Sequence, residues 1–86
     1  MPRYRVEFKP AAERDLRSLP QEITERVLTE THALADNPFP AGAKKLKGWG
    51  DVWRVRVGHY RVLYEVHGQE LLVLIVRVGH RRDIYR

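Results

Sequence analysis

Cysteine is absent from the chain, and this absence excludes several kinds of site at once. With no cysteine among its 86 residues, the protein can form neither a disulfide nor a thiolate zinc site, and it has no thiol nucleophile. Its carboxylates and histidines also lack the spacing typical of a two-metal or a zinc site. We therefore expect no metal and no cofactor.

Long hydrophobic runs are also absent. No run approaches the ~20 apolar residues that cross a bilayer, and the opening sequence MPRYRVEFKP is unlike a signal peptide. We expect a cytoplasmic protein without a membrane partner. Hydrophobic residues make up 43% of the 86 residues, which suits one core but not two. The sequence thus predicts a single domain, 1–86.

Positive charge exceeds negative charge, with 16 Lys and Arg against 11 Asp and Glu and a formal net charge of +5. The excess is clustered along the chain. The clusters are Lys44, Lys45 and Lys47, then Arg54, Arg56 and Arg61, and finally Arg77, Arg81, Arg82 and Arg86. Clustered positive charge favours a nucleic acid as the partner. A basic domain that its charge merely keeps soluble is the alternative.

The middle of the chain, 51–65, predicts a β-hairpin with arginines on one face. Apolar residues alternate with polar ones, and the two-residue turn that begins with Gly58 suits type II′. This turn places Arg56 directly opposite Arg61, with Arg54 on the same face. Like charges in that relation destabilise a sheet by a few tenths to ~1 kcal/mol. A polyanion such as an RNA backbone would compensate for this cost.

The hydrophobic pattern predicts the other elements, and together they form an α+β fold. We expect an N-terminal strand, a two-helix hairpin and then a three-stranded antiparallel meander, with the helices packed on one face of the sheet. Ser18 and Gln21 have the spacing of a capping box for the second helix. The predicted segments are a strand at 3–8, helices at 11–19 and 20–35, a loop at 39–50, and a last strand at 71–78.

The sheet face opposite the helices should combine arginines with apolar residues. Counting through a second two-residue turn pairs Val66 with Leu71 and Arg61 with Val76. Little chain remains after Val78 to cover this face, so we expect its apolar residues to stay open, as a partner site would. These residues are Leu63, Leu72, Leu74 and Val76.

Four short segments follow one another in a characteristic order. They are ALADNP at 33–38, AKKLKG at 43–48, VWRVRVGHYRVLYEV at 52–66 and VGHRRDIY at 78–85. In this order and spacing they resemble the RelE/ParE superfamily of bacterial type II toxins. The resemblance implies the fold described above. RelE-like members are ribosome-dependent mRNA endonucleases, ParE-like members inhibit DNA gyrase, and an antitoxin encoded alongside silences both.

The resemblance to the RelE branch implies a metal-independent endoribonuclease, an mRNA interferase that cleaves mRNA by attack of a 2′-hydroxyl on the adjacent phosphate. RelE-type toxins carry functional residues at the positions of Arg54, Arg56, Arg61, Arg81 and Tyr85. The arginines would stabilise the phosphorane-like transition state, with Arg81 near the leaving 5′-oxygen. Tyr85 could orient or deprotonate the 2′-hydroxyl, or stack on a base.

Further contacts are expected with the ribosome and its mRNA, and with the antitoxin. The antitoxin would cover the apolar residues of the open face. Trp49 could stack on a base, although we expect it to anchor its loop. We expect His59 to be a solvated turn residue, while His80 could donate a proton or hold structure. The basic residues assigned to the ribosome and RNA are Lys44, Lys45, Lys47, Arg77 and Arg82.

Two other functions compete with the nuclease. One is a gyrase inhibitor of the same fold, and the other is a non-enzymatic module that binds RNA or a protein partner. The arginine triplet together with Arg81 and Tyr85 favours the nuclease, because inhibition of gyrase requires no phosphate-cleaving site.

Overall fold

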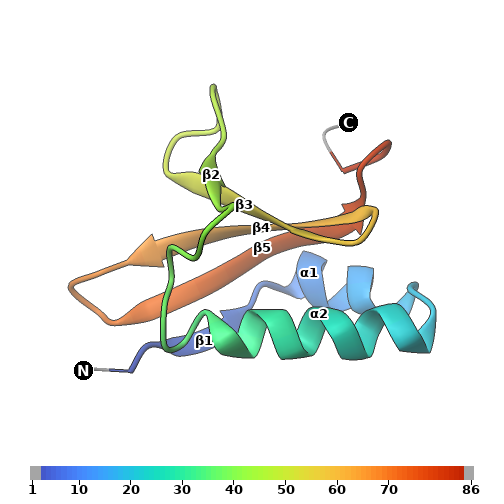
Figure 1. Ribbon diagram of the computed structural model, residues 1–86, viewed down its shortest axis with the longest axis horizontal. Coiled ribbons are helices and arrows are strands. Elements are labelled where there is room, and N and C mark those ends of the chain that lie inside the picture. The colour runs from blue at the N-terminus through green and yellow to red at the C-terminus, as the bar shows by residue number, and fades with distance from the viewer. Residues whose placement is uncertain (1–2, 85–86) are drawn as a thin grey trace.

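The computed structural model describes residues 3–84 and has two helices on one side of a twisted sheet (Figure 1). This arrangement confirms the predicted α+β fold. No helix within the described residues is long and apolar enough to cross a membrane. The elements in chain order are β1 (Arg5–Phe8), α1 (Pro10–Arg17), α2 (Gln21–Ala33), β2 (Lys44–Lys45), β3 (Val52–Val57), β4 (Tyr60–His67) and β5 (Leu72–His80).

The sheet has five strands in the order β1-β5-β4-β3-β2. The predicted meander is present as β3, β4 and β5. The structure adds β1 in parallel beside β5, and the short β2 in antiparallel beside β3. The segment 39–50, which the sequence predicts as loop, therefore contains an edge strand. Both additions extend the sheet without changing the face on which the helices lie.

The first hairpin has the predicted register. Arg56 pairs with Arg61, and Val57 pairs with Tyr60 across the turn. Gly58 has a φ of +61°, as the first central residue of a type II′ turn requires. The pairing of like charges is thus a property of the folded sheet.

The predicted register of the second hairpin is wrong. Val66 pairs with Val73 rather than Leu71, because residues 68–71 form a longer turn. A β-bulge then shifts the pairing by one more residue, so that Arg61 lies opposite Gly79 instead of Val76. A shift of two residues keeps the same side chains on each face, so alternation alone could not reveal it.

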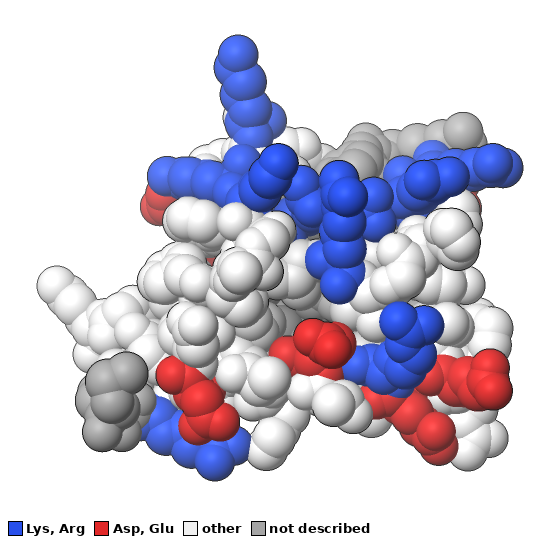
Figure 2. All heavy atoms as spheres, viewed as in Figure 1, with Lys and Arg blue, Asp and Glu red and all other residues white. Residues whose placement is uncertain are grey.

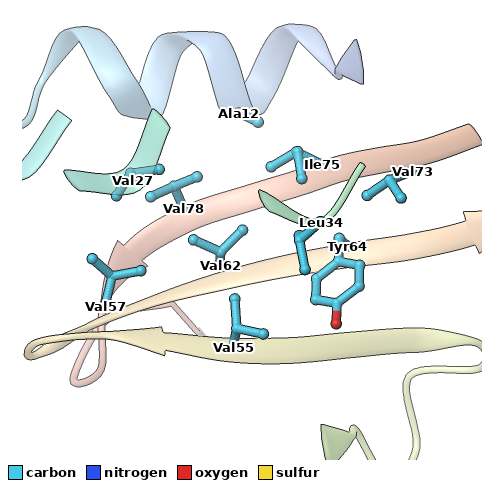
Figure 3. Close-up of a cluster of buried hydrophobic side chains, with 10 residues drawn as sticks. All are labelled: Ala12, Val27, Leu34, Val55, Val57, Val62, Tyr64, Val73, Ile75 and Val78. Carbon is cyan, nitrogen blue, oxygen red and sulfur yellow. The ribbon is translucent and has the colours of Figure 1, made fainter. Parts of the chain in front are cut away.

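The bulge has a clear consequence for packing. Ile75 and Val78 are three residues apart, yet both belong to the core between sheet and helices. A regular strand would put them on opposite faces, and the extra residue of a bulge corrects this. Figure 3 shows the core that results. Its buried members are Ala12, Val27, Leu34, Val55, Val57, Val62, Tyr64, Val73, Ile75 and Val78.

Tyr64 ties the segment after α2 to the sheet. Its side chain is fully buried, and its hydroxyl donates a hydrogen bond to the Pro38 carbonyl oxygen at 2.8 Å. Burial raises the pKa of Tyr64 to about 12, so the phenol remains a neutral donor. This bond fixes the start of the segment that leads to β2.

The predicted capping box at the start of α2 is wrong. Pro20 is the N-cap, and no side-chain hydrogen bond caps the helix. The Ser18 hydroxyl instead donates to the Asp15 carbonyl oxygen at 2.9 Å, at the end of α1. The Thr24 hydroxyl donates to the Leu16 carbonyl oxygen at 3.1 Å and so joins the two helices.

Asp15 clamps α1 onto β5 immediately after the bulge. Its Oδ2 accepts hydrogen bonds from Arg77 Nε at 2.8 Å and from the Val78 backbone N–H at 2.9 Å. Its Oδ1 accepts one from Arg77 Nη2 at 3.1 Å. The hydrogen bond to Asp15 and the charge of that carboxylate raise the pKa of Arg77. The Asp15 side chain is 17% exposed and that of Arg77 is 45% exposed, so the bond to the Val78 backbone is better shielded from water than the ion pair.

Replacing Asp15 tests this clamp. We expect Asp15→Ala to lower the free energy of unfolding by about 2–3 kcal/mol, because a half-buried charged acceptor and its three hydrogen bonds are lost. Urea denaturation followed by circular dichroism would measure it. Glu7→Ala is the control, since Glu7 is 54% exposed beside Arg5 and such surface pairs contribute at most about 1 kcal/mol. Equal losses in the two variants would contradict the assigned role.

Candidate nucleic-acid interface

A second hydrophobic cluster covers part of the sheet face opposite the helices. Its buried members are Val52, Leu63 and Ile84, and Leu46 and Val76 pack against them. The expectation that this face stays open is therefore wrong in part. The turn after β5 folds back, with the Ile84 N–H bonded to the His80 carbonyl oxygen at 3.0 Å, and Leu63 is 0% exposed. A short turn is enough to bury a cluster of this size.

Three arginines share this side of the sheet and a fourth follows β5, and we call Arg54, Arg56, Arg61 and Arg81 the arginine face. The first three lie on β3 and β4, with Arg56 directly opposite Arg61. Arg81 follows β5, and its backbone N–H donates to the His59 carbonyl oxygen at 2.9 Å. That bond holds Arg81 beside the hairpin turn. The structure thus gathers all the predicted catalytic residues except Tyr85, which lies outside the described residues.

Arg54 is the most deeply set of these arginines, at 9% exposed. Arg54 has no hydrogen bond or ion pair within residues 3–84. Every fully buried side-chain nitrogen or oxygen in these residues has a hydrogen-bond partner, so the unpartnered nitrogens of Arg54 are not fully buried. Its guanidinium nitrogens therefore keep some contact with solvent while its stem is covered. A guanidinium that reaches solvent from a covered stem, and that has no counter-charge among the described residues, is well suited to bind an anion.

Arg56 and Arg61 differ in their surroundings. Arg56 is exposed, whereas Arg61 is half-buried and donates from Nη1 to the Tyr60 carbonyl oxygen at 3.3 Å. That contact orients one edge of the Arg61 guanidinium. A planar fork held in this way can bind two oxygens of one phosphate.

The predicted RNA-binding cations do not all join the arginine face. Lys44 lies opposite Arg54 and so shares its face, whereas Lys45 lies opposite Trp53 and points to the other side. Lys45 Nζ also lies 3.2 Å from an Asp51 oxygen. Arg77 is bound to Asp15, while Lys47 and Arg82 are exposed in turns. Figure 2 shows lysines and arginines gathered along the side of β2 and the C-terminal turn.

Three rings come together beside the first hairpin turn, with Tyr60 and His80 on the helix side of the sheet, a feature that the sequence analysis missed. The rings of His59 and His80 are stacked with centroids 6.2 Å apart, and Tyr60 meets His80 edge-on at 5.5 Å. The wrong second register hid this cluster, since Tyr60 pairs with His80. The Arg82 backbone N–H donates to His80 Nδ1 at 3.2 Å, so a neutral His80 ring carries its proton on Nε2. In the described part of the chain, no group of three potential ligands could hold a metal ion.

The predicted antitoxin surface is smaller than expected. Leu72, Leu74 and Val76 are half-buried along β5, but Leu63 is wholly buried and offers no surface to a partner. The fold-back of Ile84 is the reason for this difference. What remains is a narrow apolar strip on one strand.

Comparison with known proteins identifies the family. The family model described as "ParE toxin of type II toxin-antitoxin system, parDE" matches residues 6–85. The chain belongs to the RelE/ParE superfamily of type II toxins. This confirms the resemblance that four short segments indicate.

Individual relatives match the toxin in sequence and in structure over nearly its whole length. It is 36% identical to Toxin RelG of Mycobacterium tuberculosis, with 96% of this chain and 97% of that protein covered. The toxin–antitoxin complex RelBE2 of the same organism contains a similar chain, with a TM-score of 0.85, 34% identity, and coverage of 96% and 97%. The RelE–RelB complex of Pyrococcus horikoshii OT3 contains a chain with a TM-score of 0.80 and 32% identity. The match covers 93% of this chain and 97% of that one.

The arginine pair makes a prediction about the stability of the free toxin. Arg56→Gln should raise the free energy of unfolding by a few tenths to about 1 kcal/mol, because it removes the repulsion with Arg61 across the strands. Arg82→Gln removes the same charge from an exposed turn and should change little. Thermal unfolding at low salt would compare them. A loss of stability in Arg56→Gln would show that another contact offsets the repulsion.

Proposed function

We propose that the toxin is a ribosome-dependent endoribonuclease that cleaves mRNA, rather than an inhibitor of DNA gyrase. The arginine face carries this proposal. Arg54 is only 9% exposed and has no counter-charge in the described structure, and Arg56 faces Arg61. A sheet that places cations in this way is suited to a ligand with closely spaced negative charges, such as the phosphates of RNA.

The proposed reaction is an in-line displacement at phosphorus. The 2′-oxygen of the RNA attacks the adjacent phosphate and gives its proton to a base, either Tyr85 or water. The bond from phosphorus to the 5′-oxygen breaks, and that oxygen takes up a proton from solvent. One fragment then ends in a 2′,3′-cyclic phosphate, and the other begins with a 5′-hydroxyl. Arg54, Arg56 and Arg61 would stabilise the extra charge of the transition state. Arg81, held beside the hairpin turn, would assist the leaving oxygen.

The arginine face stabilises charge but transfers protons poorly. The proposed reaction would therefore need the ribosome to reach a useful rate. Arginine is a poor proton donor or acceptor because its pKa lies far above neutral pH. Tyr85, the predicted residue at the 2′-hydroxyl, lies outside the described residues, and its role remains part of the proposal. The ribosome would supply orientation by holding the mRNA in its decoding site. The toxin would then act in the cytoplasm.

The proposed partner that silences the toxin is a cognate antitoxin. Similar chains occur in RelBE2 of Mycobacterium tuberculosis and in the RelE–RelB complex of Pyrococcus horikoshii OT3. The half-buried strip of Leu72, Leu74 and Val76 would receive an amphipathic helix of the antitoxin. Acidic residues on the same segment could pair with the arginine face. The same antitoxin segment would then cover the apolar strip and neutralise the charge of the arginine face.

Arg61→Ala tests the nuclease directly. We expect it to reduce mRNA cleavage roughly 10²–10³-fold, as the loss of one preorganised charge donor does, and to leave the fold intact. Primer extension on translating ribosomes would measure cleavage, and circular dichroism would check the fold. Wild-type cleavage by this variant would remove the arginine face from the mechanism.

The nature of the nucleophile provides the control for this experiment. A message with a single 2′-deoxy substitution just upstream of the cleaved phosphate should remain intact under the same conditions. Its cleavage at the normal rate would mean that water attacks instead. Intact mRNA together with double-strand breaks in DNA would favour the gyrase inhibitor.

Leu74→Glu tests the proposed antitoxin surface. Because Leu74 is half-buried on β5, a charge there should weaken antitoxin binding more than it weakens the free fold. Isothermal titration with the antitoxin, beside urea denaturation of the free toxin, would separate the two effects. Leu28→Glu makes the same change at a residue 44% exposed on α2 and should leave affinity unchanged. Unaltered affinity in Leu74→Glu would place the antitoxin elsewhere.

A further inference from the structure

Trp49 is a large aromatic side chain held at the surface, 40% exposed. Leu28 and Phe39 are also exposed, but both lie away from the arginine face, since Leu28 is on α2 and Phe39 packs against Trp53 on the core side of the sheet. Trp49 lies in the loop 46–51 between β2 and β3. This loop stands on the side of the sheet away from the helices (Figure 1).

The base of this loop is fixed on the side of the arginine face. The Leu46 backbone N–H donates to the Val52 carbonyl oxygen at 2.9 Å, and the Leu46 side chain packs in the second hydrophobic cluster. Gly48 and Gly50 flank Trp49 with φ angles of +83° and +66°. A Cβ at either glycine would meet nothing within 4 Å. The glycines therefore serve the backbone shape that presents Trp49, and not a close contact.

The surroundings of Trp49 are cationic. Lys44 lies opposite Arg54 and joins this loop to the arginine face, and Lys47 is exposed two residues before Trp49. Asp51, an acidic residue of the loop, has its carboxylate 3.2 Å from Lys45 Nζ. The cationic band in Figure 2 runs along this side of the molecule. An exposed aromatic ring beside a cationic track is the combination that binds single-stranded nucleic acid.

We propose that Trp49 is a stacking platform for an unpaired RNA base whose backbone the arginine face binds. The inference rests on the proposed function, since it takes RNA as the substrate. Every base has a flat π face, so this contact strengthens binding without selecting a sequence. Trp49 therefore acts in RNA affinity and positioning, and the arginines act on the phosphate.

The test uses short 2′-O-methyl RNA, which cannot be cleaved by its own 2′-oxygen, and a matched abasic backbone of the same length. The chain has two tryptophans, and Trp53 lies on the core side of the sheet. Base-bearing RNA should quench the wild-type emission, whereas the abasic backbone should not. Trp49→Phe should lose the quenching but keep the affinity. Trp49→Ala should bind base-bearing RNA roughly 5- to 100-fold more weakly, and Leu28→Ala should bind as the wild type does.

Several outcomes would overturn the inference. One is that the wild-type toxin binds the two oligomers with equal affinity at low salt. Another is that it binds neither of them. Another is unchanged RNA affinity in Trp49→Ala, which would make Trp49 a contact for a protein partner or part of the loop alone. The binding test measures no cleavage, so a failure of this inference can be told apart from a failure of the nuclease proposal. Quenching without any cleavage on ribosomes would support this site and reject the nuclease.

Discussion

The β-bulge in the pairing of β4 with β5 is the constraint on which most of the structure depends. It lets Val78 join the core although Val76 faces the opposite cluster. It also brings Tyr60 opposite His80, so that the chain leaves the sheet where Arg81 can bind the His59 carbonyl oxygen. The Asp15 carboxylate binds the backbone N–H of Val78 just after the bulge. One helix residue therefore binds the strand irregularity that sets where Arg81 leaves the sheet.

The two faces of the sheet have opposite energetic roles. The face under the helices buries branched aliphatic side chains and Tyr64, and it supplies the apolar burial that holds a small domain together. The other face places Arg56 opposite Arg61, a pairing that opposes folding. The small cluster around Leu63 and Ile84 lies on this face as well, and Arg56 remains exposed beside it. This separation lets the site keep a strained charge arrangement.

The sequence predicts the elements with local signals and fails where contacts are distant. The turn at Gly58 fixes its own register, so the opposition of Arg56 and Arg61 was predictable from spacing alone. The second turn has no such signal, and a longer turn leaves each side chain on the same face. Just after the bulge, the Val78 backbone N–H is bound by Asp15, which is 63 positions away along the chain. For the same reason, neither the stacking of the His59 and His80 rings nor the burial of Leu63 by Ile84 could be predicted.

The pairing of β2 with β3 separates two adjacent lysines, since Lys44 faces the arginines and Lys45 faces away. Which lysine joins the arginine face depends on whether the loop 46–51 has an even or an odd number of residues. Adding or removing a single residue there would exchange their positions unless a new bulge absorbed it. Changes of two residues would keep both lysines in place. The length of this loop should therefore vary in steps of two among proteins that keep the same charged surface, even where its sequence is unrelated.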